Sequence, residues 1–455
     1  MWKSQGSTDS DIFSLELIPR RGCILTPIMP NSLQIALHNN STTSDIFAYV
    51  SGISIQNGQR CLLKSNGTDL YYPQNPPSVG SPLTEDVAIP LSAPGSTTNL
   101  TIPQIAGGRL WFSRAGKLTF LLNPGPALVE PSVLNPSDPN AQLDFGFCEF
   151  TLNDAQFYGN ISYVDFVPRL PIGISLRTAG GATQVVQGMH ADGLQDVAAK
   201  LGEQGQRDGR PWEKLVVQGQ DGAPLRVLNA THGEAVGASF AGYFEPYVEK
   251  VWEHYGGRPG EMKINTQAGP GVLGGTIKGD QLHIGEEPFG KPSTADILGC
   301  NSGPFTTGPN QTRNAIIPRL AAAFVRTSLL DASEHPSHPD GFYRSDPTNH
   351  YARIVHEVNA DGKGYAFAYD DVQPDGGEDQ SGKVNAGDPV VLDVSVGGGG
   401  VGRGQDRGPP QPAPPGGGPP QGQQQVPMGG EQQQQQDGHH GFRNKLGGLM
   451  QKVMK

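Results

Sequence analysis

Short runs that alternate apolar and polar residues fill the first part of the chain, and they constrain the fold most strongly. Between residues 11 and 178 each run is only a few residues long, and clusters of proline, glycine, asparagine and serine separate the runs. A period of two is typical of strands that bury one face. We therefore expect a flexible start over residues 1–10 and an all-β sandwich or barrel over residues 11–178. The clearest runs are SLELIP, SLQIALHN, DIFAYVSGISI and KLTFLL.

The periodicity changes after Leu176, where segments with helical spacing alternate with short strand-like runs. Apolar residues recur at helical spacing in residues 193–202, 243–255 and 315–330, and the last of these has a proline near its start. The strand-like runs KLVVQG, PLRVLN and MKINT lie between these segments. The pattern predicts a mixed α/β domain over residues 179–345, with the apolar helix faces in its core.

Strand-like runs return over residues 346–396. They are YARIVHEVN, GYAFAYDDV and PVVLDVSV. A chain that leaves a β domain and later comes back to it indicates that the middle domain is inserted. The whole is thus predicted to be mainly β, with an inserted mixed α/β domain.

The last segment of the chain differs in composition from the rest. Residues 397–440 are rich in glycine, proline and glutamine, and they carry too little apolar surface to offset the loss of chain entropy, so we expect disorder. Residues 441–455 have apolar side chains at helical spacing among basic ones. This indicates either a short amphipathic helix that makes a weak membrane or protein contact, or a frayed and solvated end.

The charge balance argues against a nucleic-acid partner. The chain has 33 Lys and Arg residues against 44 Asp and Glu residues, which gives a formal net charge of −11. Contacts with phosphate groups need clustered basic residues. A neutral or weakly polar ligand fits this composition better.

No metal or cofactor is expected from the motifs. The four cysteines have no CxxC spacing, which makes a zinc site unfavourable, although they are compatible with one or two disulfides. Residues 269–274 match GxGxxG but precede a strand-like run, and Pro292 occupies the magnesium-binding position of a P-loop-like segment. The cysteines are Cys23, Cys61, Cys148 and Cys300.

The sequence leaves the cellular compartment open. It has no stretch of about 18 apolar residues, so no membrane span is expected. Its first residues show neither the basic nor the apolar segment of a secretory signal.

Residues 147–167, FCEFTLNDAQFYGNISYVDFV, predict two strands joined by a loop. Each strand carries one carboxylate among apolar residues, Glu149 on the first and Asp165 on the second. A loop centred on Phe157 would place Glu149 opposite Asp165. Because like charges that face each other destabilise a plain sheet, the two acids are either solvated on an exposed face or paired for a function.

Two carboxylates with different pKa values can divide the work of glycoside hydrolysis. One protonates the leaving oxygen while the other activates water. Separations of roughly 6.5–9.5 Å give inversion and about 5 Å gives retention through a covalent intermediate; the sequence leaves both open. Nearby hydroxyl, amide and aromatic groups suit sugar binding, and they belong to Thr151, Asn153, Tyr158 and Tyr163.

Several segments resemble the β-1,3-glucanases of glycoside hydrolase family 64, which belong to the thaumatin-like superfamily. The resemblance covers roughly residues 11–395, and GYAFAYDD (364–371) is also similar to the closing strand of thaumatin-like proteins. The other segments that carry it are GRLWFS (108–113), PGPALVEPSVLNPSDPN (124–140), FCEFTLN (147–153) and YVDFVPRLPIGISL (163–176).

The resemblance implies a function and a set of roles. It implies inverting cleavage of β-1,3-glucan into short laminari-oligosaccharides, in a wide groove between a thaumatin-like β-sandwich or barrel and an α/β domain. Glu149 would be the general acid and Asp165 the general base. Tyr158 stands where bacterial members carry tryptophan. Further residues implied for the groove are Glu130 and Asp138, which have an alternative role in stabilising their loop; Asp370 and Asp371 are interpreted as ending a strand, with a position facing the groove as the alternative.

Two other functions remain open at this point. The chain is either a glucanase or a non-catalytic thaumatin-like protein that binds β-glucan, and a third alternative is a scaffold that works through its terminal helix. For the glucanase we expect a monomer without a metal. Its substrate class indicates an extracellular or cell-wall location.

Overall fold

The computed structural model describes residues 29–398, and the account below concerns these residues. The predicted flexible start, the SLELIP run, the Gly/Pro/Gln-rich segment and the terminal helix at 441–455 lie outside the described residues.

A five-strand sheet brings the first and last described strands together. In this sheet β1 runs parallel to β24, with Gln34 opposite Val391. Strands that are far apart in sequence are therefore neighbours, and the α/β elements lie between them in the chain. The strand order is β15 (Thr183–Val186), β14 (Ile172–Thr178), β24 (Pro389–Val396), β1 (Ser32–Asn39) and β7 (Thr97–Pro103).

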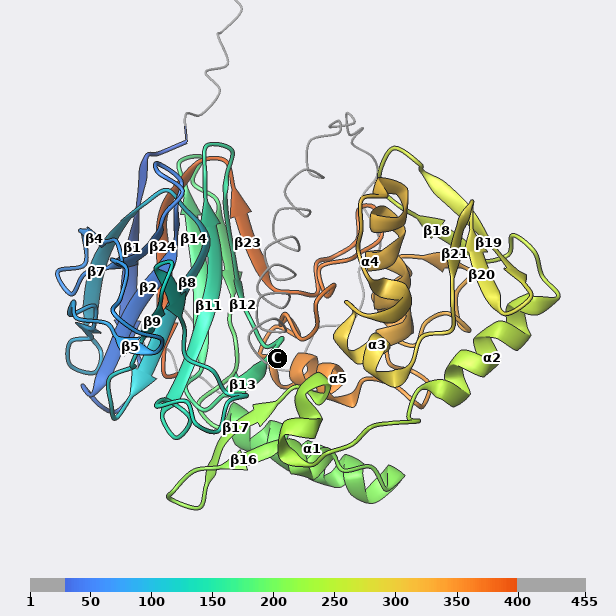
Figure 1. The fold of residues 1–455 in the computed structure, drawn as a ribbon, viewed down its shortest axis with the longest axis horizontal. Helices are drawn as coiled ribbons and strands as arrows, with labels where there is room; N and C mark the ends of the chain where they lie inside the picture. The colour runs from blue at the N-terminus through green and yellow to red at the C-terminus, as the bar shows by residue number, and fades with distance from the viewer. Residues whose placement is uncertain (1–28, 399–455) are drawn as a thin grey trace, which may run out of the picture.

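An eight-strand sheet packs against the first sheet, and together they form what we call the β lobe (Figure 1). None of the described sheets closes into a barrel, so the β lobe is built from open sheets. The order is β23 (Lys383–Ala386), β12 (Phe157–Ile161), β11 (Asp144–Leu152), β8 (Ile105–Arg114), β2 (Ile46–Ser54), β3 (Arg60–Leu63) and β4 (Leu70–Tyr71), with β6 (Ile89–Pro90) paired to β2; a small sheet of β10 (Ala127–Val129), β9 (Leu121–Asn123) and β5 (Ser81–Pro82) adds to the lobe.

The alternation along β11 decides which residues face the core. Cys148, Phe150 and Leu152 point into the core between the two large sheets. Phe147 points to the opposite face, where it packs with Trp111 in a second, smaller aromatic core. Glu149 follows Phe147 on that same face because side chains alternate along a strand.

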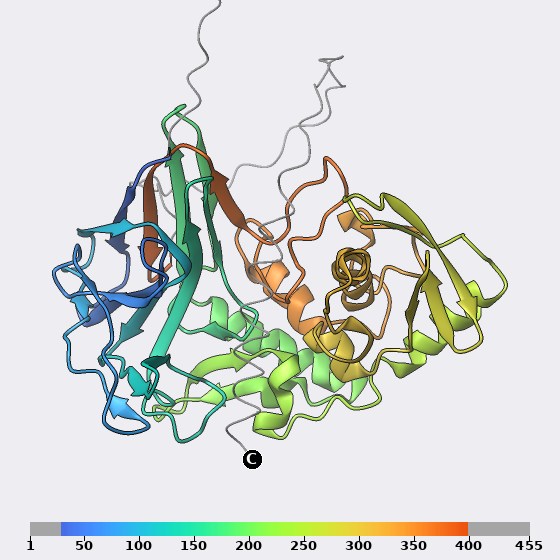
Figure 2. The same cartoon turned by 45° about the horizontal axis from the view of Figure 1, so that its top comes forward.

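Helices and two further sheets form what we call the α/β lobe. Figures 1 and 2 show the two lobes side by side, with α1, β16 and β17 below the space between them. The sheets are β13 (Phe166–Pro168), β17 (Pro224–Leu228), β16 (Val216–Gln218), and β21 (Glu287–Phe289), β20 (Gln281–Ile284), β19 (Val272–Lys278), β18 (Lys263–Asn265), β22 (Glu334–His335). The helices are α1 (Gly193–Asp208), α2 (Glu245–Gly256), α3 (Thr294–Gly299), α4 (Gln311–Val325) and α5 (His350–Val358), with short 3-10 helices η1 (Trp212–Leu215), η2 (Ala230–Val236), η3 (Gly303–Phe305) and η4 (Pro339–Gly341).

The three predicted helices are present, with different bounds. They correspond to α1, α2 and α4. Helix α4 begins earlier than predicted because the Asn310 side chain accepts a hydrogen bond from the Arg313 backbone N–H, which caps the helix. Pro318 consequently lies inside the helix instead of near its start.

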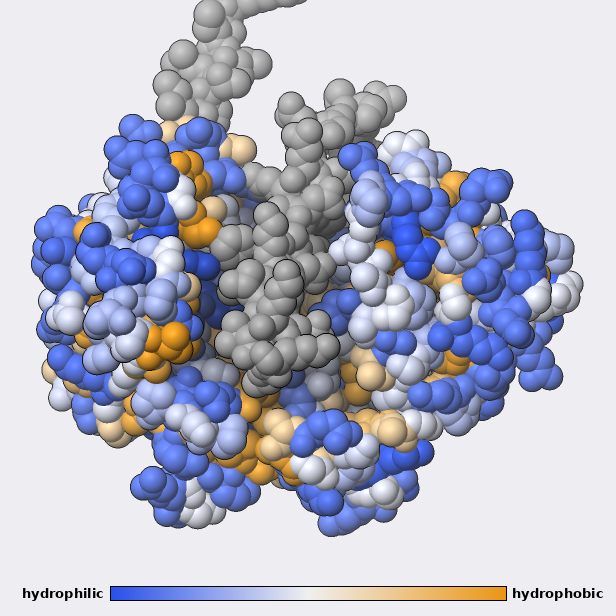
Figure 3. Space-filling view, viewed as in Figure 1, coloured by the Kyte–Doolittle hydropathy of each residue, from blue (hydrophilic) through white to orange (hydrophobic). Residues whose placement is uncertain are grey.

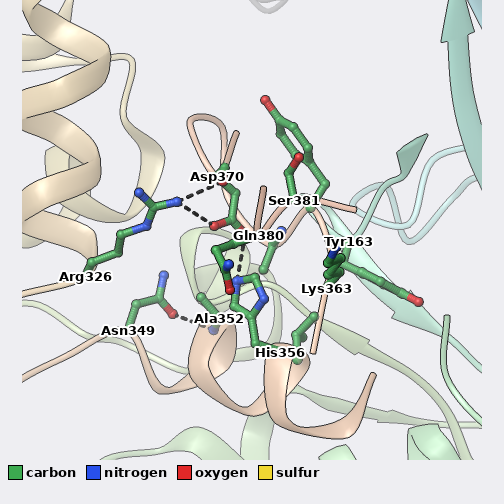
Figure 4. Close-up of polar contacts among 12 residues, drawn as sticks. Tyr163, Arg326, Asn349, Ala352, His356, Lys363, Asp370, Gln380 and Ser381 are labelled. Carbon is green, nitrogen blue, oxygen red and sulfur yellow. Dashed lines mark hydrogen bonds and ion pairs between the residues drawn. The ribbon is translucent and has the colours of Figure 1, made fainter. Parts of the chain in front are cut away.

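The strand predicted at YARIVHEVN was wrong, because this segment forms α5. Tyr351, Ile354, Val355 and Val358 are buried on one face at helical spacing. The Asn349 side chain accepts from the Ala352 backbone N–H and caps the helix (Figure 4). The alternation of apolar and polar residues in this segment was a weaker indicator of its secondary structure than the helical spacing of the apolar residues and the Asn349 cap.

The strand predicted at GYAFAYDDV was also wrong. The segment makes one isolated bridge, between Tyr365 and Ser162, and then turns. The turn forms because the Asp370 carboxylate accepts from the Ala366 backbone N–H. The third run, PVVLDVSV, forms β24 as predicted.

No helix between residues 29 and 398 is both long enough and apolar enough to span a membrane. The face drawn in Figure 3 is mostly hydrophilic over both lobes. Cys61, Cys148 and Cys300 are buried free thiols, so no disulfide joins these three.

Candidate active site

A row of polar residues crosses the eight-strand sheet. Ser51 lies opposite Arg109, and Arg109 lies opposite Glu149. Glu149 in turn lies opposite Asn160, and Asn160 lies opposite Lys383. Because paired residues of neighbouring strands share a face, all five side chains lie on one side of the sheet. This side ends at β23 and β12, the edge of the sheet nearest the α/β lobe (Figure 1).

Arg109 lies between two glutamates of this site. Its Nε donates to Glu149 Oε1 at 3.3 Å, and an Nη atom donates to Glu130 Oε2 at 3.0 Å. The guanidinium also stacks over the Phe147 ring, at 4.8 Å from the ring centre. The Glu149 side chain is 12% exposed, so it is accessible from one side while Arg109 fixes its orientation.

The charges around Arg109 place Asp165 at the same site. Burial lowers the pKa of the Arg109 guanidinium, but the neighbouring carboxylates outweigh it, so the net pKa is raised. Asp165 is one of the three carboxylates that raise it, together with Glu130 and Glu149. Glu149 and Asp165 therefore both lie near the Arg109 guanidinium.

The predicted register of the hairpin was wrong. Glu149 faces Asn160, not Asp165, and the second strand ends at Ile161. The reason is the tight turn at Asn153, whose Oδ1 accepts from two backbone N–H groups just ahead of it. The turn makes the second strand begin at Phe157, where the prediction had centred the loop.

Asp165 instead lies in the bend just before β13. Its backbone carbonyl accepts from the Asn229 backbone N–H at 3.0 Å. Its Oδ1 lies 3.3 Å from His232 Nε2, and its side chain is 33% exposed. Asp165 thus avoids the cross-strand clash with Glu149 that the predicted register required.

A cavity of about 120 Å³ opens beside Asp165. The segment just before β13, η2 and loops of the α/β lobe line it. Its wall contains Asp165, His232, Asn301, Thr307 and Tyr369. A carboxylate, an imidazole, an amide and a hydroxyl therefore face one small space, which suits a polar ligand or an ordered water.

Two of the residues predicted to contact the sugar, Thr151 and Tyr158, lie on the same face of the sheet as Glu149. Thr151 faces Tyr158 across β11 and β12, two residue pairs along from Glu149 and therefore on the same face. Thr151 Oγ1 accepts from the Gly107 backbone N–H. Burial, together with the charges of Asp371, Asp379 and Glu149, raises the pKa of the Tyr158 phenol, so it stays protonated and able to donate.

Tyr163 does not lie on that face. Its ring is 2% exposed, and its hydroxyl donates to Asn359 Oδ1 at 3.1 Å. The prediction grouped it with the residues suited to sugar binding. It belongs to the core because the chain has already left β12 at this point, so the alternation no longer applies.

Three other predicted residues have structural partners. Asn153 caps the β11–β12 turn through its own side chain. Asp138 accepts from the Ser132 and Asn140 backbone N–H groups, which agrees with the alternative role of stabilising its loop. Glu130 lies at the site itself, where it binds Arg109 and Ser51.

Asp370 belongs to a buried ionic cluster that supports the cavity wall (Figure 4). It bonds Arg326 at 3.1 Å and His356 at 2.9 Å, and the residue is 1% exposed. It also holds the turn that carries Tyr369 to the cavity. The interpretation that Asp370 and Asp371 end a strand was wrong, because both lie in this turn.

Sequence reasoning missed Arg109 and His232. Arg109 lies in GRLWFS, on the same face as Trp111, and a lone arginine between apolar residues on a strand was the available signal. His232 had no comparable signal. It lies 67 positions from its partner Asp165 and reaches it only through the fold.

Comparisons with known proteins identify the family. The model of glycoside hydrolase family 64, described as β-1,3-glucanase, matches residues 31–396. The match covers most of the chain, so the chain belongs to this family of glycoside hydrolases.

Two curated relatives are similar over the same part. The chain is 31% identical over 357 residues to a glucan endo-1,3-beta-glucosidase of Cellulosimicrobium cellulans, and 30% identical over 357 residues to one of Arthrobacter sp. strain YCWD3. In each case the alignment covers 76% of this chain and 62% of the relative. The chain therefore matches less than two thirds of the length of these relatives.

Solved structures agree in fold. A laminaripentaose-producing beta-1,3-glucanase in complex with laminaritetraose superposes with a TM-score of 0.71 at 31% identity, covering 81% of this chain and 99% of that one. A beta-1,3-glucanase domain from Clostridium beijerinckii gives a TM-score of 0.63 at 22% identity, with coverages of 81% and 99%. The second likeness shows the fold alone.

Proposed function

We propose that the protein hydrolyses β-1,3-glucan by an inverting acid/base mechanism and releases short laminari-oligosaccharides. Glu149 protonates the glycosidic oxygen, and Asp165 takes a proton from the water that attacks the anomeric carbon from the opposite face. The observation that carries the proposal is that Glu149 bonds Arg109 at 3.3 Å and that Asp165, like Glu149, raises the pKa of Arg109, so both carboxylates lie near the same guanidinium.

The surroundings of the two acids suit these different roles. Glu149 is the more enclosed of the two, with a 12% exposed side chain, whereas the Asp165 side chain is 33% exposed and opens to the cavity. A general base needs room for water between itself and the sugar. The cavity beside Asp165 offers that room.

The family relationship supports the substrate class. The curated relatives are glucan endo-1,3-beta-glucosidases, and the structural neighbour at 31% identity holds laminaritetraose. Thr151 and Tyr158 are the side chains we propose as sugar contacts, because they lie next to Glu149 on the same face.

We also infer that the α/β lobe is an inserted domain of a thaumatin-like β-sandwich and that the glucan lies between the lobes. The neighbouring positions of β1 and β24 support the insertion, since the chain closes the same sheet that it opened. The cavity beside Asp165, which is lined by the α/β lobe and by the segment that leads from β12 to β13, supports the position of the glucan.

The test is the release of reducing ends from laminarin and curdlan. The wild-type protein is expected to release them, and Glu149→Gln and Asp165→Asn are expected to lose at least about 10³-fold in kcat, because each removes one of the two proton transfers. Both variants should still co-sediment with curdlan. Glu261→Gln is the matched control, since Glu261 is an arginine-paired glutamate of the α/β lobe, bound to Arg258.

The rival function, glucan binding without cleavage, predicts a different result. A wild-type protein that co-sediments with curdlan but releases no reducing ends would favour it. Loss of cleavage and binding together in Glu149→Gln would also contradict the proposed role, because the isosteric amide keeps the shape of the groove.

A further inference from the structure

Arg109 creates a problem for the proposed general acid. Its Nε lies 3.3 Å from Glu149 Oε1. A positive charge at this distance stabilises the ionised carboxylate. A general acid has to carry its proton when the substrate binds. By itself, Arg109 would therefore work against protonation of Glu149.

Glu130 offsets the charge of Arg109. Glu130 Oε2 accepts from Arg109 at 3.0 Å, a shorter contact than the one that Arg109 makes with Glu149. The Arg109–Glu130 pair has no net charge when Glu130 is ionised. Glu149 then sees the negative charge of Asp165 without an unbalanced positive charge beside it.

The hydrogen bonds around Glu130 give a donor to each of its two carboxylate oxygens. The Trp111 indole N–H can only donate, and it donates to Ser51 Oγ at 3.0 Å. The Ser51 hydroxyl proton is then directed to Glu130 Oε1, at 2.6 Å. Both oxygens of Glu130 accept, one from Ser51 and one from Arg109, so Glu130 has no need of a proton.

This arrangement is built into the fold. Trp111 and Ser51 are fully buried, so water does not compete for their hydrogen bonds. The Phe147 ring supports the Arg109 guanidinium from below. Ser51 and Arg109 also lie directly opposite each other on β2 and β8. The position of Glu130 is thus set by the core of the sheet.

The other charged or titratable groups near Glu149 leave this balance intact. Lys383, two strands away in the same row, pairs with Asp379 at 3.7 Å. Tyr158 is neutral because its pKa is raised. Arg109 on β8 bonds Glu149, and the charge of Glu149 also raises the pKa of Tyr158 on β12. Glu130 and Asp165 act on Arg109, whereas Asp371 and Asp379, of the segment before β23, act on Tyr158.

We propose that Glu130 is a positioning residue for the reaction, which binds Arg109 and so allows Glu149 to keep its proton. The proposal rests on the proposed function, with Glu149 as the general acid. Arg109 then orients the Glu149 carboxyl, and Glu130 removes the electrostatic cost of that orientation.

The experiment measures the pH profile of kcat/KM on laminarin for one variant that removes the negative charge of Glu130 and one that removes the positive charge of Arg109. The basic limb of this profile, where activity falls as the pH rises, reports the loss of the proton from the general acid. In Glu130→Gln the charge of Arg109 is unbalanced, so the basic limb moves to lower pH by about 1 unit. In Arg109→Gln the negative charge of Glu130 is unbalanced, so the basic limb moves to higher pH. In the double variant both charges are gone, and the limb returns near its wild-type position. Glu261→Gln is the control, with an unshifted limb.

A loss of packing alone would not shift the limb in opposite directions. Glu130→Asp keeps the charge and is expected to keep the limb near that of the wild type, even with a lower kcat. A folded Glu130→Gln whose basic limb coincides with the wild-type limb would overturn the proposal. If one single variant fails to fold, the double variant still tests the proposal. A basic limb of the double variant displaced by about 1 pH unit from the wild-type limb would contradict the role of Glu130.

A titration separates this proposal from the proposed function. Carbon-13 NMR of the glutamate side-chain carboxyls, with Glu149→Gln used to assign the signal, reports Glu149 without any turnover. The signal is expected to titrate at lower pH in Glu130→Gln than in the wild type. If the wild type releases no reducing ends, the proposed function fails, while an unshifted titration would overturn the role of Glu130 itself.

Discussion

His232 Nε2 lies 3.3 Å from Asp165 Oδ1, and both residues line the cavity beside β13. His232 belongs to η2, whose N-cap residue Asn229 donates its backbone N–H to the Asp165 carbonyl. Side chain and backbone of Asp165 are therefore both held by one short helix. The geometry indicates that His232 orients the carboxylate of the proposed general base.

This relationship predicts a change in kcat more than in KM. His232→Ala removes one hydrogen bond to a charged group, which is worth about 1.5 kcal/mol, so kcat on laminarin is expected to fall about tenfold. His232→Gln retains a donor and should recover part of the loss. His283→Ala on β20, in the other sheet of the α/β lobe, is the control. An unchanged kcat in folded His232→Ala would contradict the orienting role.

Tyr163 and Tyr158 are expected to behave in opposite ways. Tyr163→Phe removes the hydrogen bond to Asn359 in the core, so the free energy of unfolding should fall by about 1 kcal/mol with activity retained. Tyr158→Phe should weaken laminarin binding with little effect on stability. Denaturant unfolding and KM measure the two effects. Weakened laminarin binding in Tyr163→Phe at unchanged stability would restore Tyr163 as a sugar contact.

The predictions for the hairpin show which of its features the amino-acid sequence could indicate. Glu149 and Asp165 were recognisable because each is a carboxylate within an apolar run, and both lie near Arg109. Their register was not recognisable, since it depends on the two backbone N–H groups that Asn153 captures. The position of Tyr163 in the core follows from the end of β12, which the same turn determines.

The partners of the two acids, Arg109 and His232, could not be predicted from the sequence for another reason. Arg109 is 40 positions from Glu149 and His232 is 67 positions from Asp165. Such contacts depend on which strands become neighbours, and periodicity carries no information about that. The helix α5 was misread because a nine-residue segment with an apolar stripe also shows alternation over parts of its length.

Asp370 is expected to matter for stability. Arg326 is 2% exposed and Asp370 is 1% exposed, so Asp370→Ala leaves a buried, uncompensated guanidinium and should cost about 3–5 kcal/mol in free energy of unfolding. Asp340→Ala is the control, since its side chain is 88% exposed beside His338 and its loss should cost about 0.5 kcal/mol or less. Chemical denaturation of both variants measures the difference. Equal losses would contradict the buried role of Asp370.

His335 is expected to make the protein less stable in mild acid. Burial lowers the pKa of His335 from 6.5 to about 4, and its Nε2–H donates to the Ala332 carbonyl. Because the folded pKa is below the unfolded one, the stabilisation is complete above pH 6.5 and is lost as the pH falls towards 4. The loss amounts to about 3 kcal/mol. Urea unfolding of wild type and His335→Gln at several pH values checks this, and equal slopes in that window would contradict it.

The stereochemistry of the first product tests the shared action of Glu149 and Asp165 most directly. Proton NMR during the first minutes of laminarin hydrolysis distinguishes the two anomers of the new reducing end before mutarotation mixes them. Attack by water from the face opposite the leaving oxygen predicts that the α-anomer accumulates first. Initial accumulation of the β-anomer would contradict the account, because it would require a covalent intermediate on one of the two carboxylates.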